Sequence, residues 1–225
     1  MTAPEQDERG RWSLRFASAE AEVAFRSWHN ETALPYVRVG MLSSLVAWIL
    51  VVVAVPIADP SAGPSAVILV APVIAAILAA FGATFLRGRA DRAMSLGVLA
   101  NIIAGIVIVE MSQLVGSVIY MAAGIPIASF IGATVLRQRL VPSALTIGGY
   151  TSYATWMVLE AFMADRIKHK DVVFLLLVFV VSVMLSLMAA YVLELVSRVS
   201  FAQGRLLARN RRRSKMNGSV QMSSC

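Results

Sequence analysis

Six long apolar stretches limit what this chain can fold into more than any other feature of its sequence. Each has about the 17 to 25 residues that an α-helix needs to cross a hydrocarbon core of about 30 Å. Unpaired backbone amides are costly in lipid, and the stretches lack the alternation of apolar and polar residues that strands show, so helices are expected. We therefore predict an all-α fold, a polytopic transmembrane helical bundle with six spans. The predicted spans are residues 37–57, 66–86, 93–110, 115–136, 142–163 and 172–196.

The spans divide the chain into three predicted parts. Residues 1–36 form a cytoplasmic N-terminal segment with an interfacial amphipathic helix, 37–196 form the transmembrane domain, and 197–225 form a basic exit helix with a disordered tail. The segments outside the membrane are far shorter than the roughly 100 residues of a typical soluble domain. A soluble catalytic domain is therefore not expected in this chain.

The positive charges indicate the orientation of the chain in the membrane. The net charge is +7, but the basic residues gather on one side, which fits the positive-inside rule with both termini in the cytoplasm. Anionic lipid of the inner leaflet is thus the expected partner of these residues, and nucleic acid is not needed to explain them. We expect a multi-pass protein of the cell inner (plasma) membrane. The outer side would hold only Arg166, Lys168 and Lys170.

The segment before the first span has its own helix signals. Ser18 is a suitable cap, Glu20 and Glu22 follow in the first turn, and Pro35 predicts a break before the span. Aromatic residues mixed with arginines indicate either an anchor on the membrane surface or a docking element that contacts a partner or the inner loops. These aromatic residues are Trp12, Phe16, Phe25, Trp28 and Tyr36.

Polar side chains near the outer ends of the spans form the candidate ligand site. Ionisable groups at membrane depth are costly, so each one requires an explanation. We predict that six residues border one outward-facing pocket; alternatively, the two glutamates extend to water at the interface. The candidate ligand-binding residues are Glu110, Gln113, Tyr120, Tyr153, Trp156 and Glu160.

Other residues inside the spans predict how the helices pack. Asn101 is expected to form an interhelical hydrogen bond, and Gly105, Gly148 and Gly149 are expected to allow close helix packing. Pro126 lies in the middle of its span, where a kink can open a cavity.

A short pattern occurs twice in the chain. Residues 82–89 read GATFLRGR and residues 132–139 read GATVLRQR, and each copy ends a predicted span on the inner side. The pattern indicates either a duplicated helical hairpin or convergence, because any span that ends on the inner side favours small residues followed by arginine.

Motifs for catalysis or metal binding are not found in the sequence. It has no glycine-rich phosphate loop and no nucleophile motif, and its two histidines, His29 and His169, fall on opposite sides of the membrane in the predicted topology. We expect no enzyme activity from this chain alone, no metal site and no cofactor.

The last span continues into a basic helix that is the candidate signal exit. Glu194 and Arg198 are spaced as a helix-surface ion pair. Apolar residues at spacings of four, three and four form a seam that indicates either a short coiled coil in a homodimer or a helix lying on anionic lipid. The seam residues are Leu195, Val199, Ala202 and Leu206.

Two segments resemble a known family. Residues 14–16 (LRF), 20–29 (EAEVAFRSWH) and 34–38 (LPYVR) are similar to the start of the six-helix membrane modules of bacterial class III adenylate/guanylate cyclases. Residues 193–201 (LELVSRVSF) are similar to the segment that joins those modules to their catalytic domain. The metal-binding aspartates and nucleotide-binding residues of the family have no counterpart here. The resemblance therefore implies a membrane anchor or sensor module rather than cyclase activity.

These observations predict a module that anchors, dimerises and relays a membrane or outer-side signal through its last helix. The partner would be a cytoplasmic effector domain or protein, such as a nucleotide cyclase. A small-solute transporter or channel, or a scaffold subunit, is the alternative, although the acidic groups lie near span ends and not at mid-bilayer where proton-coupled transporters place charges.

Overall fold

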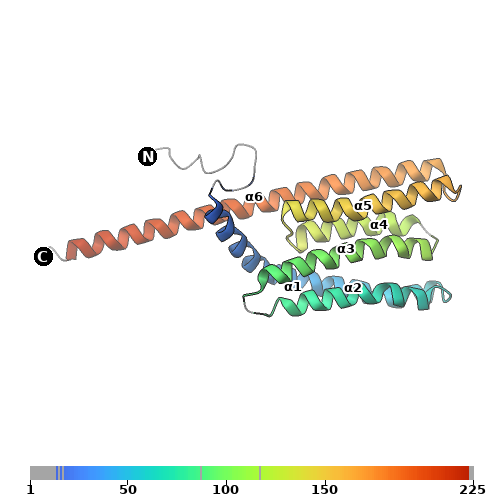
Figure 1. The fold of residues 1–225 in the computed structure, drawn as a ribbon, viewed down its shortest axis with the longest axis horizontal. Helices are drawn as coiled ribbons and strands as arrows, with labels where there is room; N and C mark the ends of the chain where they lie inside the picture. The colour runs from blue at the N-terminus through green and yellow to red at the C-terminus, as the bar shows by residue number, and fades with distance from the viewer. Residues whose placement is uncertain (1–13, 15, 17, 87, 117, 223–225) are drawn as a thin grey trace. The chain divides into compact units, whose positions relative to one another are not determined.

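The fold is entirely helical in the part of the chain that the structure describes. The structure is a computed structural model that describes residues 14, 16, 18–86, 88–116 and 118–222. Figure 1 shows the helices in chain order. They are α1 (Ala19–Ala58), α2 (Gly63–Ala83), α3 (Ala90–Leu114), α4 (Val118–Phe130), the π-helix η2 (Ile131–Val135), α5 (Leu140–Met163) and α6 (His169–Met222).

Four of these helices are long and apolar enough to cross a membrane. They are α1, α2, α3 and the part of α6 up to Ala208, whereas α4 contributes a shorter apolar helix. Large aliphatic side chains on these helices are exposed, among them Ile57 at 78% and Met184 at 67%. Water-soluble proteins rarely expose such side chains in contiguous patches, so lipid is the environment that suits this surface. The chain is a helical membrane protein.

The predicted spans four and five correspond to helices of a different character. The fourth is divided, because α4 ends at Phe130 and a π-helical turn continues to Val135. The fifth matches α5 in position, but it is less apolar because it contains several serines, threonines and tyrosines. Ser143, Thr146 and Thr151 are buried, so these polar groups face protein.

Helix α1 corrects the prediction of a break at Pro35. The helix runs without interruption from Ala19 to Ala58 and includes both Pro35 and Pro56. Pro35 is exposed, and so is Glu31, the residue whose carbonyl loses its hydrogen bond to the proline. The unpaired carbonyl therefore faces outward, where solvent or lipid headgroups can satisfy it. At its start, Ser18 caps α1 as predicted: its Oγ accepts a hydrogen bond from the amide of Ala21 at 3.3 Å.

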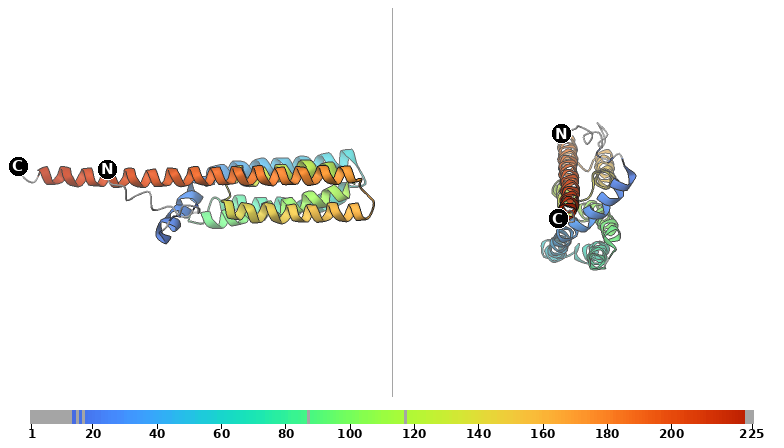
Figure 2. Two further views of the ribbon diagram at one scale, coloured as in Figure 1. Left: turned by 90° about the horizontal axis from the view of Figure 1, so that it is seen from above. Right: turned by 90° about the vertical axis from the view of Figure 1, so that its left-hand side faces the viewer.

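The chain divides into two compact units. The bundle unit comprises Asn30–Tyr191, and the terminal unit comprises the described residues up to His29 together with those from Val192 onward. Successive helices of the bundle unit run in opposite directions, as Figures 1 and 2 show. Connections of only a few residues require this arrangement.

Tyr150 lies at the centre of one of the two apolar clusters of the bundle unit. Its side chain is 2% exposed, and its hydroxyl donates to Oγ of Ser129 at 2.9 Å, which joins α5 to α4. The ring packs directly against α3, because a Cβ atom on Gly105 would lie 2.5 Å from it. Gly105 therefore allows the close packing that was predicted. Gly148 and Gly149 do not, since no described atom lies within 4 Å of a Cβ built on either one.

Residues near the start of the bundle unit contact both copies of the repeated pattern. Arg38 of α1 donates from Nη2 to the carbonyl oxygen of Thr84 at 2.6 Å, and its guanidinium lies 4.4 Å from the ring centroid of Phe85. The guanidinium of Arg137 lies 3.8 Å from the ring centroid of Tyr36. The two copies differ in backbone, because the first caps α2 whereas the second contains the π-helical turn.

The loop between α1 and α2 carries an acidic group. Asp59 accepts hydrogen bonds from the hydroxyl of Ser61 at 2.6 Å, from its amide at 3.0 Å and from the amide of Ala62 at 3.3 Å. These donors stabilise the carboxylate and hold the pKa of Asp59 below its ordinary value. The turn thus fixes a negative charge at the connection between the first two helices.

Candidate functional site: a buried ion-pair cluster on helix α6

The terminal unit contains a buried polar cluster on the exit segment of α6, here residues 192–208. Glu194, Arg198 and Phe201 lie on one face of the helix at spacings of four and three residues. Their exposed fractions are 7%, 5% and 9%. A charged side chain is rarely buried without a partner, so this face of α6 must be covered by groups that satisfy the charges.

Arg198 is the centre of the cluster and binds two carboxylates. Its Nη1 and Nη2 atoms donate to the two carboxylate oxygens of Glu22 at 2.7 and 3.1 Å, in the bidentate geometry that suits a guanidinium. Its Nε and Nη2 atoms also donate to Oε1 of Glu194 at 3.0 and 2.6 Å. The first helix and the last helix of the chain are therefore joined through one arginine.

Further donors surround Glu22 and balance the charge of the cluster. The amide of Phe16 donates to Oε2 of Glu22 at 3.2 Å, and Nε of Arg26 lies 3.6 Å from Oε1. With Arg26 included, two acidic groups face two basic groups. The side chain of Arg26 is 47% exposed, so Arg198 is the basic group that is buried with the carboxylates.

Aromatic rings cover the cluster. The guanidinium of Arg198 lies 4.3 Å from the ring centroid of Phe25 and 5.4 Å from that of Phe16, within the range of cation–π attraction. Phe201 packs against these rings and against Trp28, with centroids 5.4 to 5.8 Å apart. The cover excludes water, which strengthens the electrostatic attraction inside the cluster.

Three of the N-terminal aromatic residues contact the exit segment of α6. Phe25 is fully buried, and the rings of Phe16, Phe25 and Trp28 pack against Phe201. Tyr36 belongs to the bundle unit and stacks with Arg137. Trp12 lies outside the described residues.

The sequence predicted the Glu194–Arg198 pair but placed it on the helix surface, which is wrong, because both side chains are buried. Glu22 was interpreted only as an acidic residue of a first helical turn. A pairing between residues 176 positions apart has no local signal, so it could not be predicted from the sequence.

The four seam residues of the exit segment flank the buried face. Leu195, Val199 and Ala202 are half-buried, and Leu206 is 39% exposed. The described side chains from Gln203 to Ala208 are all exposed. Within the terminal unit, no other part of the described chain therefore covers the end of the seam at Leu206.

The six predicted ligand residues differ in their surroundings. Tyr153 donates a hydrogen bond to Oε1 of Glu110, and Glu160 lies 3.7 Å from Arg166. Trp156 is 63% exposed, and Gln113 is partly buried. Tyr120 lines a different hollow between α1, α3 and α4 that none of the other five residues lines. Among the described contacts of these residues, the hydrogen bond between Tyr153 and Glu110 joins two of the six.

Metal binding has no support in the described part of the chain, where no group of three or more potential ligands is found. No protein-family model matches the chain, and neither a curated protein nor a solved structure matches it. The geometry is accordingly the basis for a functional hypothesis.

Proposed function

We propose that this chain is a six-span membrane module that relays a signal from the membrane or the outer side, through α6, to a cytoplasmic effector. The observation that carries this proposal is that α6 is one long helix whose exit segment is held by the contacts of Arg198 with Glu22. Helix α6 has 54 residues, about 80 Å at about 1.5 Å per residue, whereas about 20 residues suffice to span a membrane. A continuous helix of this length is suited to carrying a displacement out of the bilayer.

The cluster supplies the element that such a relay needs. A signal requires two arrangements of similar free energy that an input can bias. Removing one partner of a buried ion pair costs about 3–5 kcal/mol, so Glu22 holds the exit segment in one defined arrangement. A rotation or shift of α6 that separates Arg198 from Glu22 would define the other arrangement.

We place the chain in the inner (plasma) membrane with both termini in the cytoplasm. Arg38 contacts the first copy of the repeated pattern, and Arg137 of the second copy contacts Tyr36, so two arginines lie near the ends of α2 and η2, where the positive-inside rule expects cytoplasmic residues. Basic residues of the exit segment would then face anionic lipid headgroups.

The exposed end of the exit segment supports a homodimer. Leu206 and Leu207 are 39% and 63% exposed, and they continue a helix whose opposite residues are basic. Two copies of this helix would bury these leucines in a short coiled coil. A dimeric exit would suit an effector that acts as a pair, such as the catalytic domain of a nucleotide cyclase.

A chimera tests the relay directly. The catalytic domain of a bacterial adenylate cyclase, which is active only as a dimer, is fused after residue 225 of the full chain, and cyclic AMP is measured in membranes. Ala202→Pro interrupts α6 beyond the cluster and should lower the output severalfold. Ala202→Leu keeps the helix and should not.

Both variants must insert to the same level for the comparison to count, which immunoblots of washed membranes establish. Equal cyclic AMP output from Ala202→Pro and Ala202→Leu would overturn the relay. Solute flux through liposomes that contain the unfused chain would favour the transporter alternative instead.

A further inference from the structure

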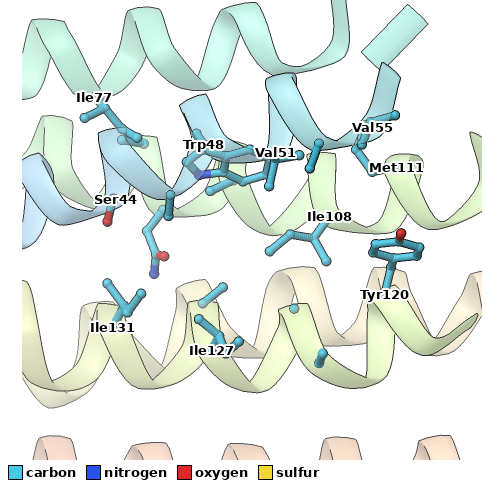
Figure 3. Close-up of a pocket in the computed structure, with 18 of the residues that line it drawn as sticks. Ser44, Trp48, Val51, Val55, Ile77, Ile108, Met111, Tyr120, Ile127 and Ile131 are labelled. Carbon is cyan, nitrogen blue, oxygen red and sulfur yellow. The ribbon is translucent and has the colours of Figure 1, made fainter. Parts of the chain in front are cut away.

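The bundle unit contains a hollow that the proposed relay does not use. It has a volume of about 400 Å³ and lies between α1, α3 and α4. In Figure 3, Trp48 and Val51 of α1 face Ile127 of α4 across an open space, and Tyr120 and Met111 lie at one end. Tyr120 and Ile127 of its lining are exposed, so the hollow opens to the surface of the bundle unit. Pockets for small molecules are about 300–1,000 Å³. The hollow is therefore of the size of a ligand site.

Small residues create the hollow. Ala100 and Ala104 of α3 face Ala123, Gly124 and Ala128 of α4 around it. In membrane proteins, such residues normally let helices approach one another closely. Here they leave space unfilled between α3 and α4.

The lining determines what kind of molecule fits. Among the described residues that line the hollow, none is charged, and nearly all are apolar. A charged ligand would lose its hydration without compensation there. The occupant must therefore be uncharged and largely hydrocarbon.

One buried amide provides a specific polar contact. Asn101 lines the hollow, is 6% exposed, and its Nδ2 has no hydrogen-bond partner among the described residues. The interhelical hydrogen bond that the sequence predicted for this donor is thus not made. A buried donor without an acceptor costs free energy, and rotation about the soft χ2 torsion is enough to turn Nδ2 toward the hollow.

The backbone of the neighbouring helix is shaped around this amide. A Cβ atom on Gly132 would overlap Nδ2 of Asn101, so only glycine allows the amide to lie there. Gly132 belongs to the π-helical turn, where the amide of Leu136 donates to the carbonyl of Ile131 at 3.0 Å. Single π-helical turns are rare and occur frequently at functional sites.

We infer that the hollow binds a neutral lipid that carries a carbonyl oxygen partway along its hydrocarbon chain, with Asn101 donating to that oxygen. The apolar lining recognises the chain and the amide recognises the oxygen. This inference holds whether or not α6 relays a signal, because it concerns binding alone.

A matched pair of ligands tests the inference with the full chain in detergent. One is the methyl ester of a long saturated fatty acid with a mid-chain ketone, and the other is the same ester without the ketone. A ligand that binds the folded state raises the thermal midpoint in proportion to its affinity. We expect the ketone ester to bind about fivefold more tightly, as one additional hydrogen bond provides.

Variants separate the role of Asn101 from that of the hollow. Asn101→Leu removes the unpaired donor, so it should keep or raise the midpoint of the ligand-free protein while abolishing the preference for the ketone. Ala123→Leu fills the hollow and should weaken the response to both esters. Ala79→Leu, on an exposed face of α2 outside the hollow, is the matched control and should respond as the wild type does.

Three results would overturn the inference. Equal binding of the two esters by the wild type would remove the carbonyl contact. A lower ligand-free midpoint for Asn101→Leu, with the ketone preference retained, would make Asn101 a structural residue. A change in dimer content in Ala123→Leu without any ester selectivity in the wild type would assign the hollow to a second copy of the chain.

Discussion

The guanidinium of Arg198 binds both carboxylate oxygens of Glu22, 176 positions earlier in the chain, and both side chains are buried. The same guanidinium binds Glu194 one turn earlier on its own helix. This arrangement makes Arg198 the only basic group that is buried with two carboxylates among the described residues of the terminal unit, and its loss would leave them facing each other.

Replacing Arg198 by methionine should release the N-terminal part of α1 from the exit segment. The variant leaves two buried carboxylates without their main partner, which costs about 3–5 kcal/mol. Hydrogen exchange of the amides in residues 19–29 should therefore accelerate strongly, as mass spectrometry of the protein in detergent can measure. Arg205→Met is the control, because Arg205 is exposed and contacts the ring of Phe201 at 5.7 Å.

A double variant tests whether the loss of stability in Arg198→Met arises from the unpaired carboxylates. Glu22→Gln combined with Arg198→Met removes one of the unpaired carboxylates, so the double variant should be less destabilised than the sum of the two single variants. Strict additivity would mean that the ion pair does not stabilise the terminal unit.

Gly105 and Gly148 should respond in opposite ways to alanine. A Cβ atom on Gly105 meets the ring of Tyr150 at 2.5 Å, so Gly105→Ala should cost about 1–3 kcal/mol as an overpacked core does. A Cβ on Gly148 meets no described atom within 4 Å, and alanine is the better helix former by up to about 1 kcal/mol. Thermal unfolding of both variants in detergent measures the difference; a similar loss in both would contradict the packing described for Tyr150.

The contacts of Glu110 and Glu160 should differ in how much they stabilise the fold. Tyr153→Phe removes the hydrogen bond to Glu110 and should cost about 1–2 kcal/mol, because that contact is partly buried and its acceptor is a carboxylate. Arg166→Met breaks the pair with Glu160, whose side chains are 59% and 48% exposed, and should cost less than about 1 kcal/mol. Thermal unfolding of both variants in detergent measures the loss of stability. Equal losses in Tyr153→Phe and Arg166→Met would argue against partial burial of the Tyr153 contact.

The proposed orientation predicts which cysteines are labelled from outside. The chain has one cysteine, Cys225, and Ser61 lies in the loop after α1. In intact cells, a membrane-impermeant maleimide should label the double variant that combines Ser61→Cys with Cys225→Ser. It should label Cys225 of the wild type only after the membrane has been permeabilised. Labelling of Cys225 in intact cells would place the C-terminus outside and would reject the proposed orientation with both termini in the cytoplasm.

The helices could be predicted from the sequence because apolar runs and loop residues are local signals. The predicted span 142–163 differs from α5 by only two residues at its start. Pro35 misled the prediction, since its effect depends on whether the carbonyl of Glu31 faces outward, which the sequence does not reveal. The π-helical turn after Phe130 was also missed, because the sequence has no local signal that distinguishes it from an α-helical turn.

The candidate site was predictable only in part, because it depends on tertiary contacts as well as on local spacing. Glu194 and Arg198 are neighbours on one helix turn, so their pairing follows from spacing. Glu22 completes the cluster through tertiary packing, and no local pattern relates it to Arg198. The six outer residues were grouped by depth in the membrane, but depth does not determine which face of a helix each one occupies.

The pairing of Glu22 with Arg198 also sets an order of events during synthesis. Glu22 lies near the start of α1 and therefore leaves the ribosome before α2, α3, α4 and α5, whereas Arg198 follows only after them. The acidic group must therefore remain without its arginine while those four helices are made, and the ion pair that closes the terminal unit can form only late in synthesis.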